Sequence, residues 1–537
     1  MAEEDIIFGK NRHLFGGIEP SNMTRFLAER VAHSDKVIIT TILPSDTVIN
    51  GQVLCTVAGA VIRKSTTEYP KDEFDGELVA NIASSQTIED AGTGDIYYAA
   101  FPYSDQGVYN RSDANRAFVK DPTSGIYGYD LDTADPDPAT RVTYPDDCDN
   151  YYYQAAAMDK TSGVFDYGDW PSEAGDIFMP KPCMLKYDGT VDYYLDPNDY
   201  SKKEDGTSSD ISNTAYGGNA MMEWPKIYTK RWEDEDGIYH FRCSLTNPDD
   251  TYECWCNYDK NNNEIDHFYT SIYECIKVGS VARSLSGGKK LDNFNYNTSS
   301  NNYVSTLILT AYDNGDDWTN EVLSDRLLIT DLLVMMCKTT NGQAAIGSGV
   351  AHTSSSDTVT NTGTMNNRGL FYYDVGTKAV KVFGMEHWWG NNGRLISGIA
   401  GTTGTNGLSL YVKFTRGTKD GSANTDYYFK ASNGNYAKRA EGHKQITTLT
   451  GSGYMTAFIC TDAGRIPDGR IEGSSTTYEC DYTSIAGWSS KYKLLAIVGF
   501  NGAGQGGPFE YRISIKEDSN DQQPGVGVGL SCKPSAT

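Results

Sequence analysis

The sequence has no apolar run near the roughly 20 residues that a membrane-spanning helix requires. Its acidic start, MAEEDII, lacks both the basic region and the apolar region of a secretory signal. Positive charge is scarce as well, since 46 Lys and Arg stand against 71 Asp and Glu and the net charge is -25. Such a surface repels phosphate backbones. We therefore expect a soluble protein made in the cytoplasm, with no membrane insertion and no nucleic-acid partner.

The motifs of the common catalytic and metal sites are missing too. The seven His residues show no HxH, HxxH or HxxxH spacing, and GxSxG, Walker A and HExxH patterns do not occur. The 11 Cys include no CxxC pair, so buried thiols are expected. For Cys254 and Cys256 we favour a strand with both sulfurs on one face over a structural zinc site. We predict no enzymatic activity, catalytic residue, metal or cofactor, and an iron site built from distant His and carboxylate residues is the alternative.

One loop approaches the ligand pattern of a calcium site. In DKNNNEIDHF, side-chain oxygens come from Asp259, Asn261, Asn263 and Asp266 at suitable spacing. The twelfth position, however, is Thr270 and not the Glu that completes such a loop. We favour a hairpin loop with Asx turns.

The chain does contain enough apolar material for globular domains. It is 39% hydrophobic and 22% charged, and 537 residues exceed the span of one hydrophobic core, so two or three domains are expected. Among the aromatic residues, 37 Tyr outnumber 18 Phe and 8 Trp. Tyrosine joins a rigid apolar ring to a hydroxyl that tolerates water, which suits wet contact surfaces.

The first 35 residues contain FGKNRHLFGGIEPSNMTRFLAERVA, in which we expect one short helix and no separate core. We interpret residues 1–35 as a segment that attaches to a partner or a neighbouring subunit, with ordinary terminal disorder as the alternative.

Residues 36–118 are expected to form an all-β sandwich, because β-rich runs at 37–43, 53–63, 78–82 and 96–103 are separated by turn residues. The pieces LPSDTVINGQVLCTVAGAVIRKS, YPKDEFDGELV and GDIYYAAFPYSDQGVYN resemble fibronectin type III-like modules near the N-termini of tail and fibre proteins from gut bacteriophages. The residues that carry this resemblance are Tyr69, Pro70, Asp75, Gly76, Tyr97, Tyr98, Phe101, Pro102 and Tyr103.

An acidic linker is expected at residues 119–145, which are rich in Asp and Pro and contain ADPDPAT. Residues 146–537 alternate short strands with Gly, Asn and Asp turns, and we expect an α+β domain with long loops. The one convincing helix spans 320–340, with Asn341 and Gly342 as a left-handed stop. Its apolar residues at mixed three and four spacing are Val322, Leu323, Leu327, Leu332, Leu333 and Met336.

Three segments of this second region resemble the C-type-lectin-like domains related to formylglycine-generating enzyme, including those of phage tail proteins and diversity-generating retroelement variable proteins. They are RGLFYYDVGTKAVKVFGMEHWWGNNGRLISG, the closing VGFNGAGQGGPFEYRISIKEDSNDQQPGVGVGLSC, and FMPKPCMLKYDGTVDYYLDPNDYSKKEDG with GGNAMMEWPKIY. The resemblance implies core packing for Phe383, Trp388 and Trp389, which we favour over a carbohydrate-stacking platform. The catalytic cysteines of the enzyme are not matched, because Cys532 is the only Cys in the last 50 residues.

The candidate binding surface is the last segment of this domain. Tyr511, Ile513 and Ile515 alternate with polar residues at the period of a half-buried strand, and Gly-rich polar loops flank them. The predicted contact residues are Phe500, Asn501, Gln505, Glu510, Arg512, Ser514, Lys516, Asp518, Asn520 and Gln523. Glu510, Lys516 and Pro524 stand where the family's diversified positions carry Asn and Tyr, so active diversification stays open.

The resemblances imply a non-enzymatic protein on the surface of a bacteriophage particle that binds a host glycan or outer-membrane protein. Its N-terminal segment would contact other virion proteins, and a homotrimer is the expected assembly. Many copies on one particle would make weak single contacts useful. Two alternatives remain: a purely structural virion protein, such as a head-fibre, baseplate or decoration subunit, and a polysaccharide depolymerase with a carboxylate pair in a groove.

Overall fold

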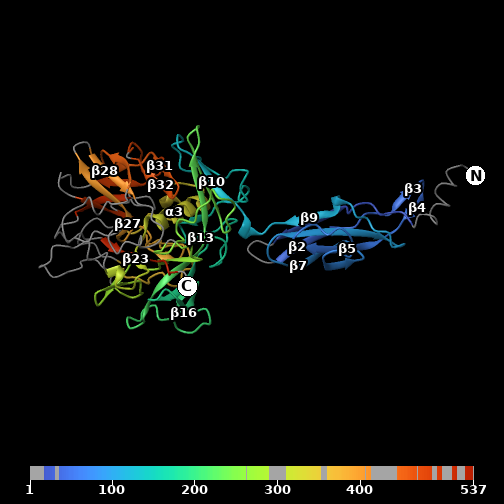
Figure 1. Cartoon of the computed structure of the whole chain (residues 1–537), viewed down its shortest axis with the longest axis horizontal. Coiled ribbons are helices and arrows are strands. Elements are labelled where there is room, and N and C mark those ends of the chain that lie inside the picture. The colour runs from blue at the N-terminus through green and yellow to red at the C-terminus, as the bar shows by residue number, and fades with distance from the viewer. Residues whose placement is uncertain are drawn as a thin grey trace, which may run out of the picture. The chain divides into compact units, whose positions relative to one another are not determined.

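A computed structural model represents the chain, and its description covers residues 17–30, 36–261, 263–288, 310–351, 360–404, 407–412, 444–468, 470–485, 493–498, 511–516 and 526–535. The chain divides into unit 1, Met1–Gly125, and unit 2, Ile126–Thr537. It is mostly β, with 41% strand and 7% helix (Figure 1). No helix in the described part is both long and apolar enough to cross a membrane.

Unit 1 consists of two antiparallel sheets that face each other across a core. One sheet has the order β1 (Arg25–Arg30), β2 (Lys36–Ile42), β7 (Gln86–Ala91), and the other the order β6 (Glu77–Ile82), β5 (Val57–Ser65), β8 (Ile96–Ser104), β9 (Arg116–Val119). Val37 and Ile39 from the first sheet pack with Tyr98 and Val119 from the second, and all four are buried. A small hairpin, β3 (Thr47–Ile49) and β4 (Gln52–Cys55), precedes β5.

The helix predicted in the first 35 residues is not found in residues 17–30, the part of this segment that the structure describes, where Arg25–Arg30 forms the strand β1. This strand pairs with β2 from Arg25 opposite Ile42 to Arg30 opposite Val37. Ala28 is buried in the core and Phe26 packs beside it, so alternate side chains of a six-residue segment reach the interior. The sandwich therefore begins before residue 36, since pairing with a neighbouring strand prevails over local helix preference.

Unit 2 is built from three larger sheets. The seven-stranded sheet has the order β16 (Asp199–Lys203), β15 (Val191–Asp196), β14 (Lys181–Lys186), β17 (Gly218–Pro225), β20 (His267–Ser271), β37 (Leu530–Cys532), β23 (Trp318–Asn320). The four-stranded sheet has the order β11 (Val142–Thr143), β10 (Tyr127–Asp132), β19 (Ile238–Ser244), β18 (Tyr228–Glu233). The eight-stranded sheet has the order β29 (Lys444–Leu449), β28 (Gly407–Val412), β27 (Gly393–Gly404), β34 (Lys493–Val498), β35 (Tyr511–Lys516), β33 (Tyr482–Ile485), β30 (Gly453–Tyr454), with β36 (Val526–Val528) paired to β27.

Smaller elements complete unit 2. The short sheets are β12 (Ala157–Asp159) with β13 (Val164–Asp166), β21 (Ile276–Val278) with β22 (Val281–Arg283), β24 (Tyr372–Tyr373) with β25 (Val380–Val382) and β26 (Met385–Glu386), and β31 (Phe458–Thr461) with β32 (Gly464–Pro467). The helices of unit 2 with both ends among the described residues are α3 (Leu323–Cys337) and α4 (Gly342–Ala345).

The division between the units lies inside the predicted linker, yet residues 126–145 belong to unit 2. β10 lies between β11 and β19, and its Tyr129 is fully buried. The ADPDPAT stretch is a turn between β10 and β11, in which the carboxylates of Asp132, Asp135 and Asp137 accept hydrogen bonds from nearby backbone N–H groups. The Asp and Pro content of this stretch reflects Asx turns rather than a linker. The linker prediction is therefore wrong for residues 126–145.

The predicted helix at 320–340 is confirmed as α3, but every one of its residues is buried. It is therefore enclosed on all sides instead of presenting one apolar face. The helix ends at Lys338, which has the left-handed φ of 50°, and not at Asn341 and Gly342. Asn341 instead caps α4, where its side chain accepts a hydrogen bond from Ala344 N at 2.8 Å.

The aromatic cluster Phe383, Trp388 and Trp389 is part of the core, as predicted, because each side chain is at most 1% exposed. Trp389 Nε1 donates to Gly347 O at 3.0 Å, and the guanidinium of Arg326 lies 3.8 Å from the centre of the Trp388 ring. No face of either Trp ring is available to a sugar.

None of the 11 cysteines, all of which the structure describes, forms a disulfide, and ten of them are buried. The strand predicted at Cys254 and Cys256 is wrong. The chain turns there, and Asn257 N donates to Cys254 O at 2.8 Å. The nearby Asp259 carboxylate accepts hydrogen bonds from Asn261 N, Asn263 N and Asn263 Nδ2. The loop is a hairpin with Asx turns, as the sequence predicts.

Candidate binding surface

The predicted binding segment enters the eight-stranded sheet as β35. The strand pairs antiparallel with β34, with Val498 opposite Tyr511, and parallel with β33, with Ile485 opposite Ile513. The predicted strand is thus confirmed, and it is bonded on both edges. Three predicted contact residues, Arg512, Ser514 and Lys516, belong to β35, whose backbone alone is described. The other seven lie outside the described residues: Phe500, Asn501, Gln505, Glu510, Asp518, Asn520 and Gln523.

The end of the chain is fastened to the interior of unit 2. β36 pairs in parallel with the start of β27, and β37 lies between β20 and β23 in the seven-stranded sheet. Just after β37, Lys533 Nζ contacts Asp325 Oδ1 of α3 at 2.7 Å, and Ser531 Oγ donates to Asp325 Oδ2 at 2.6 Å. The chain on either side of residues 517–525 is therefore held by backbone pairing, and its last part also by a buried ion pair.

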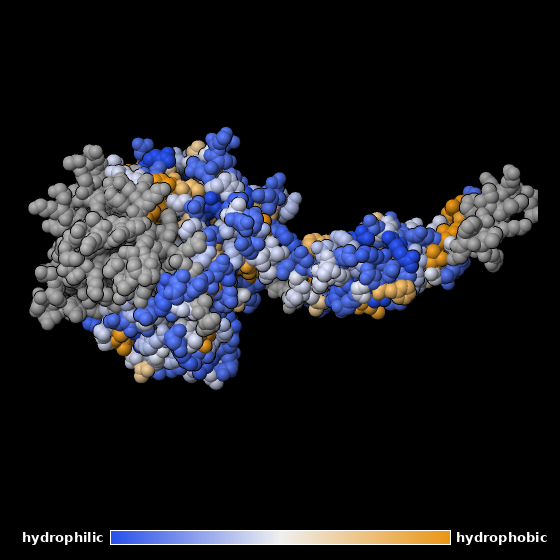
Figure 2. Space-filling model, viewed as in Figure 1, coloured by the Kyte–Doolittle hydropathy of each residue, from blue (hydrophilic) through white to orange (hydrophobic). Residues whose placement is uncertain are grey.

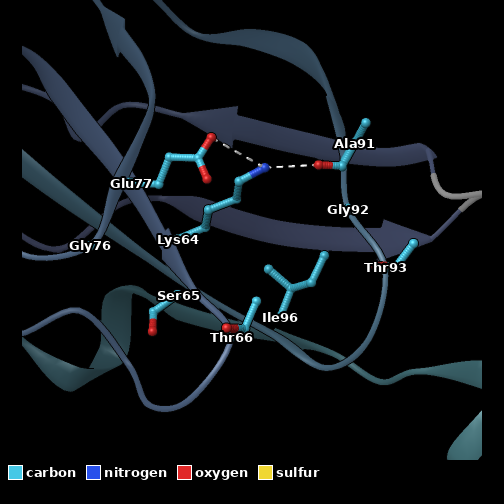
Figure 3. A pocket seen from close by; sticks show the side chains of 9 residues that line it. All are labelled: Lys64, Ser65, Thr66, Gly76, Glu77, Ala91, Gly92, Thr93 and Ile96. Atoms are coloured by element: carbon cyan, nitrogen blue, oxygen red, sulfur yellow. Dashed lines mark hydrogen bonds and ion pairs between the residues drawn. The ribbon is translucent and has the colours of Figure 1, made fainter.

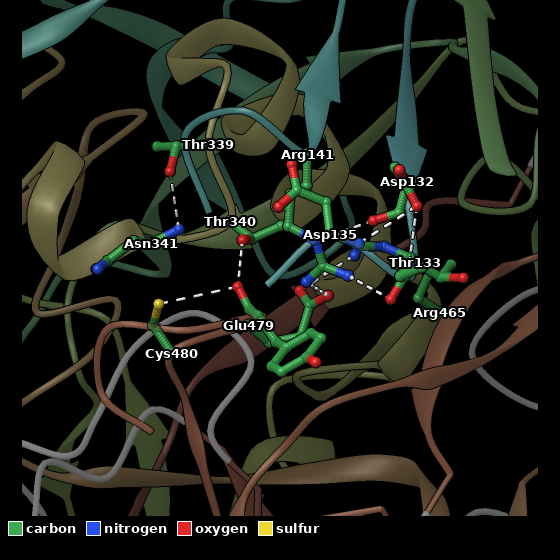
Figure 4. Close-up of polar contacts among 12 residues, drawn as sticks. Asp132, Thr133, Asp135, Arg141, Thr339, Thr340, Asn341, Arg465, Glu479 and Cys480 are labelled. Atoms are coloured by element: carbon green, nitrogen blue, oxygen red, sulfur yellow. Dashed lines mark hydrogen bonds and ion pairs between the residues drawn. The ribbon is translucent and has the colours of Figure 1, made fainter. Parts of the chain in front are cut away.

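A chain of buried charges connects elements of unit 2 beside this sheet, and Figure 4 shows three of its members, Arg141, Glu479 and Arg465. Arg141 Nη1 lies 2.8 Å from Glu479 Oε1, and Glu479 Oε2 lies 3.2 Å from Arg465 Nη1. Arg465 Nε is 3.6 Å from Asp331 Oδ1, and Arg231 Nε is 2.9 Å from Asp331 Oδ2. Charges of opposite sign alternate through the five groups, so each ion faces a counter-charge away from water.

This network joins separate parts of unit 2. Asp331 comes from α3, Arg231 from β18 and Arg465 from β32, while Arg141 precedes β11 and Glu479 precedes β33. The cavity beside Arg465 and Glu479 measures about 10 Å³, which is close to the space of one water molecule. These ions therefore hold the scaffold together and leave no room for a substrate among them.

A second buried titratable pair lies close to the Trp cluster. Lys381 Nζ donates to Met365 O at 2.9 Å and lies 3.8 Å from the centre of the Tyr200 ring. Glu386 accepts hydrogen bonds from Gly363 N and Met365 N at 2.7 and 2.8 Å. Burial lowers the pKa of Lys381 to about 7, and burial also raises the pKa of Glu386. Among the described residues, no cluster of three or more His, Cys, Asp or Glu is arranged to hold a metal ion.

Unit 1 carries an open groove of about 540 Å³ lined by residues of β5, β6, β7 and the start of β8. Figure 3 shows Lys64 extending across it. Lys64 Nζ donates to Asp90 Oδ1 at 3.0 Å and to Ala91 O at 2.8 Å, and it lies 3.8 Å from Glu77 Oε1. The ammonium of Lys64 therefore contacts residues of both sheets, and its role in the groove is to hold the two sheets together.

The predicted binding site does not include one exposed feature of unit 2. Tyr151 and Tyr152 follow Asn150 in the run NYYYQ, and both are exposed. Three consecutive tyrosines next to an Asp-rich stretch are the sequence signal for this surface.

No family model matches the sequence, and no curated protein matches it. A proposal of function therefore rests on the strand arrangement and the contacts described above.

Proposed function

We propose that this chain is a non-enzymatic binding protein on the surface of a bacteriophage particle, and that unit 2 attaches it to the host cell. The strand orders β1-β2-β7 and β6-β5-β8-β9 support a fibronectin type III-like sandwich for unit 1. Unit 2, with few helices and several sheets, supports the C-type-lectin-like domain that the sequence resembles.

The observation that carries the proposal is the anchoring of the C-terminal segment. β35 is bonded on both edges, and β36 and β37 pair with β27, β20 and β23. A framework of this kind tolerates changes in polar connecting residues at little cost in stability, which suits a recognition surface. Neighbouring copies, in a homotrimer, would add avidity to weak single contacts, and the N-terminal segment would contact other virion proteins.

The partner is a glycan or a protein of the host outer membrane. The test is the adsorption rate of particles, or of the isolated protein, to susceptible cells. Arg512→Ala with Lys516→Ala should lower adsorption by about tenfold or more. The matched control is Lys186→Ala with Lys202→Ala, which removes two exposed positive charges elsewhere on unit 2 and should leave adsorption unchanged.

The proposal is wrong if adsorption stays at the wild-type rate even when Phe500, Asn501 and Gln505 are changed as well. In that case a purely structural virion role becomes the better explanation.

A further inference from the structure

The face of the protein in Figure 2 is mainly hydrophilic where it is described, with hydrophobic residues in small separate patches. Few large residues with apolar side chains or rings are exposed in the described part of the chain. Two of these residues are adjacent tyrosines. The side chain of Tyr152 is 89% exposed and that of Tyr151 is 43% exposed. Every other tyrosine whose burial is described is buried or half-buried. Among the tyrosines whose burial is described, solvent exposure of this extent is therefore particular to this pair.

The backbone that carries the pair is rigidly held. Asn150, which is fully buried, accepts a hydrogen bond from Gly128 N and donates one to Gly128 O, both at 2.9 Å. On the other side, the Tyr153 ring packs against Trp170 with 5.1 Å between ring centres. The pair thus projects from between two anchored residues, so binding a ligand would require little ordering of the backbone.

The two rings form a corner. Their centres are 4.6 Å apart and their planes meet at 69°. The apolar C–H face of a pyranose ring fits against a flat aromatic face, and a tyrosine hydroxyl can exchange hydrogen bonds with sugar hydroxyls. A corner of two rings can contact a sugar from two sides.

The charge around the pair restricts the ligand. Asp146, Asp147 and Asp149 are exposed and lie in the same loop. Arg242 pairs with Asp147 at 3.0 Å, so the loop keeps a negative balance of charge with one cation against three carboxylates. Carboxylates accept hydrogen bonds from sugar hydroxyls and attract an amino group, whereas they repel the carboxylate of an acidic sugar. They also disfavour a second copy of this chain, because two chains of net charge -25 would bring like charges together here.

We propose that Tyr151 and Tyr152 form a saccharide-binding site for neutral or amino sugars, separate from the C-terminal segment. It goes beyond the proposed receptor-binding function and does not depend on it. Repeated on many copies, a site of millimolar affinity would hold a particle near a glycan-covered surface.

The test is saturation-transfer NMR and titration of the purified full-length protein with four probes. Cellotetraose and mannotetraose are neutral, chitosan tetramer carries amino groups, and tetragalacturonic acid is acidic. We expect at least one of the first three to bind and the acidic probe not to bind. Tyr152→Ala, and Tyr151→Ala combined with it, should weaken binding at least tenfold. Tyr152→Phe keeps the ring and should stay within about threefold of the wild type.

The matched control is Phe74→Ala, which removes an aromatic side chain that is 77% exposed on unit 1 and should leave binding unchanged. The Arg512→Ala and Lys516→Ala variant should also keep saccharide binding, which separates this site from the receptor proposal. The proposal is overturned if no neutral or amino-sugar probe binds at 10 mM, on the order of a weak single site. It is also overturned if Tyr152→Ala leaves binding intact, or if that variant alters the oligomeric state instead.

Discussion

Arg141 and Glu479 form an ion pair at 2.8 Å although 338 residues separate them along the chain. Each side chain is only 1% exposed. Arg141 lies in the stretch whose composition predicts a linker, and Glu479 lies just before β33 of the eight-stranded sheet. The pair therefore fastens the beginning of unit 2 to the sheet that contains the candidate binding segment.

Arg141→Ala should lower the free energy of unfolding of unit 2 by about 1.5–3 kcal/mol, because it removes a buried charged hydrogen bond of Glu479 while Arg465 still faces that carboxylate. Urea unfolding followed by Trp fluorescence measures this directly, since all eight Trp lie in unit 2. Lys202→Ala is the control, because the Lys202–Asp199 pair is 52% and 26% exposed and its loss should cost less than about 1 kcal/mol. Equal urea midpoints for the two variants would contradict the structural role of Arg141.

A fragment that begins at Ile126 should fold, whereas one that begins at Asp146 should not. The longer fragment keeps β10, which pairs with β19 over six positions, and the Tyr129 hydroxyl that donates to Asp331 Oδ1 at 2.7 Å. It also keeps Arg141. Circular dichroism and cooperative unfolding distinguish the two, and in the full chain limited proteolysis should cut first at 120–125. Cooperative unfolding of the shorter fragment would show that β10 is dispensable.

Alternation and apolar content predict much of the fold. The strand character of β35 and the position of α3 follow from local patterns, whereas the burial of Trp388 and Trp389 was expected from the family resemblance. Each local pattern depends on residues close together in the sequence, whose spacing alone indicates which side chains share a face.

Features that depend on distant partners could not be predicted in this way. β1 is a strand because β2 lies beside it, and Asp331 is tolerated inside a buried helix because Arg231 and Arg465 reach it from β18 and β32. The ADPDPAT turn has the composition of a linker, and only the pairing of β10 with β19 distinguishes the two. The exposure of Tyr152 likewise depends on which neighbours leave it uncovered.

Lys381 should make the stability of unit 2 depend on pH. Burial lowers its pKa to about 7 in the folded state, whereas its ordinary value is 10.5. Between pH 7 and 9 Lys381 therefore binds more protons in the unfolded chain than in the folded chain, so its own contribution to stability should rise with pH by up to about 1.4 kcal/mol per pH unit. Buried thiols such as Cys148 and Cys337, whose pKa burial raises to about 12 from the ordinary 9.0, contribute the opposite slope near pH 9, so the contribution of Lys381 is measured against a variant. Lys381→Met should remove this contribution, so in urea unfolding at several pH values the wild type should gain stability relative to this variant as the pH rises. Exposed Lys378, changed to Met, should preserve it, and identical slopes for both variants would refute the assignment.

Stability and binding should respond to different faces of β35. Ile513 lies opposite Ala496 of β34 and Ile485 of β33, and the sequence alternation assigns it to the apolar face. Ile513→Ala should therefore lower the free energy of unfolding by about 2–5 kcal/mol, as truncation of a core side chain does. Arg512 and Lys516 lie at positions that alternate with Ile513. Arg512→Ala and Lys516→Ala should therefore each change the free energy of unfolding by less than about 0.5 kcal/mol, as at ordinary surface positions. Urea unfolding of the three single variants, with adsorption measured on the same samples, tests this separation. If Arg512→Ala destabilises unit 2 as much as Ile513→Ala, its side chain serves the core, and the polar face of β35 is not free to contact a host molecule.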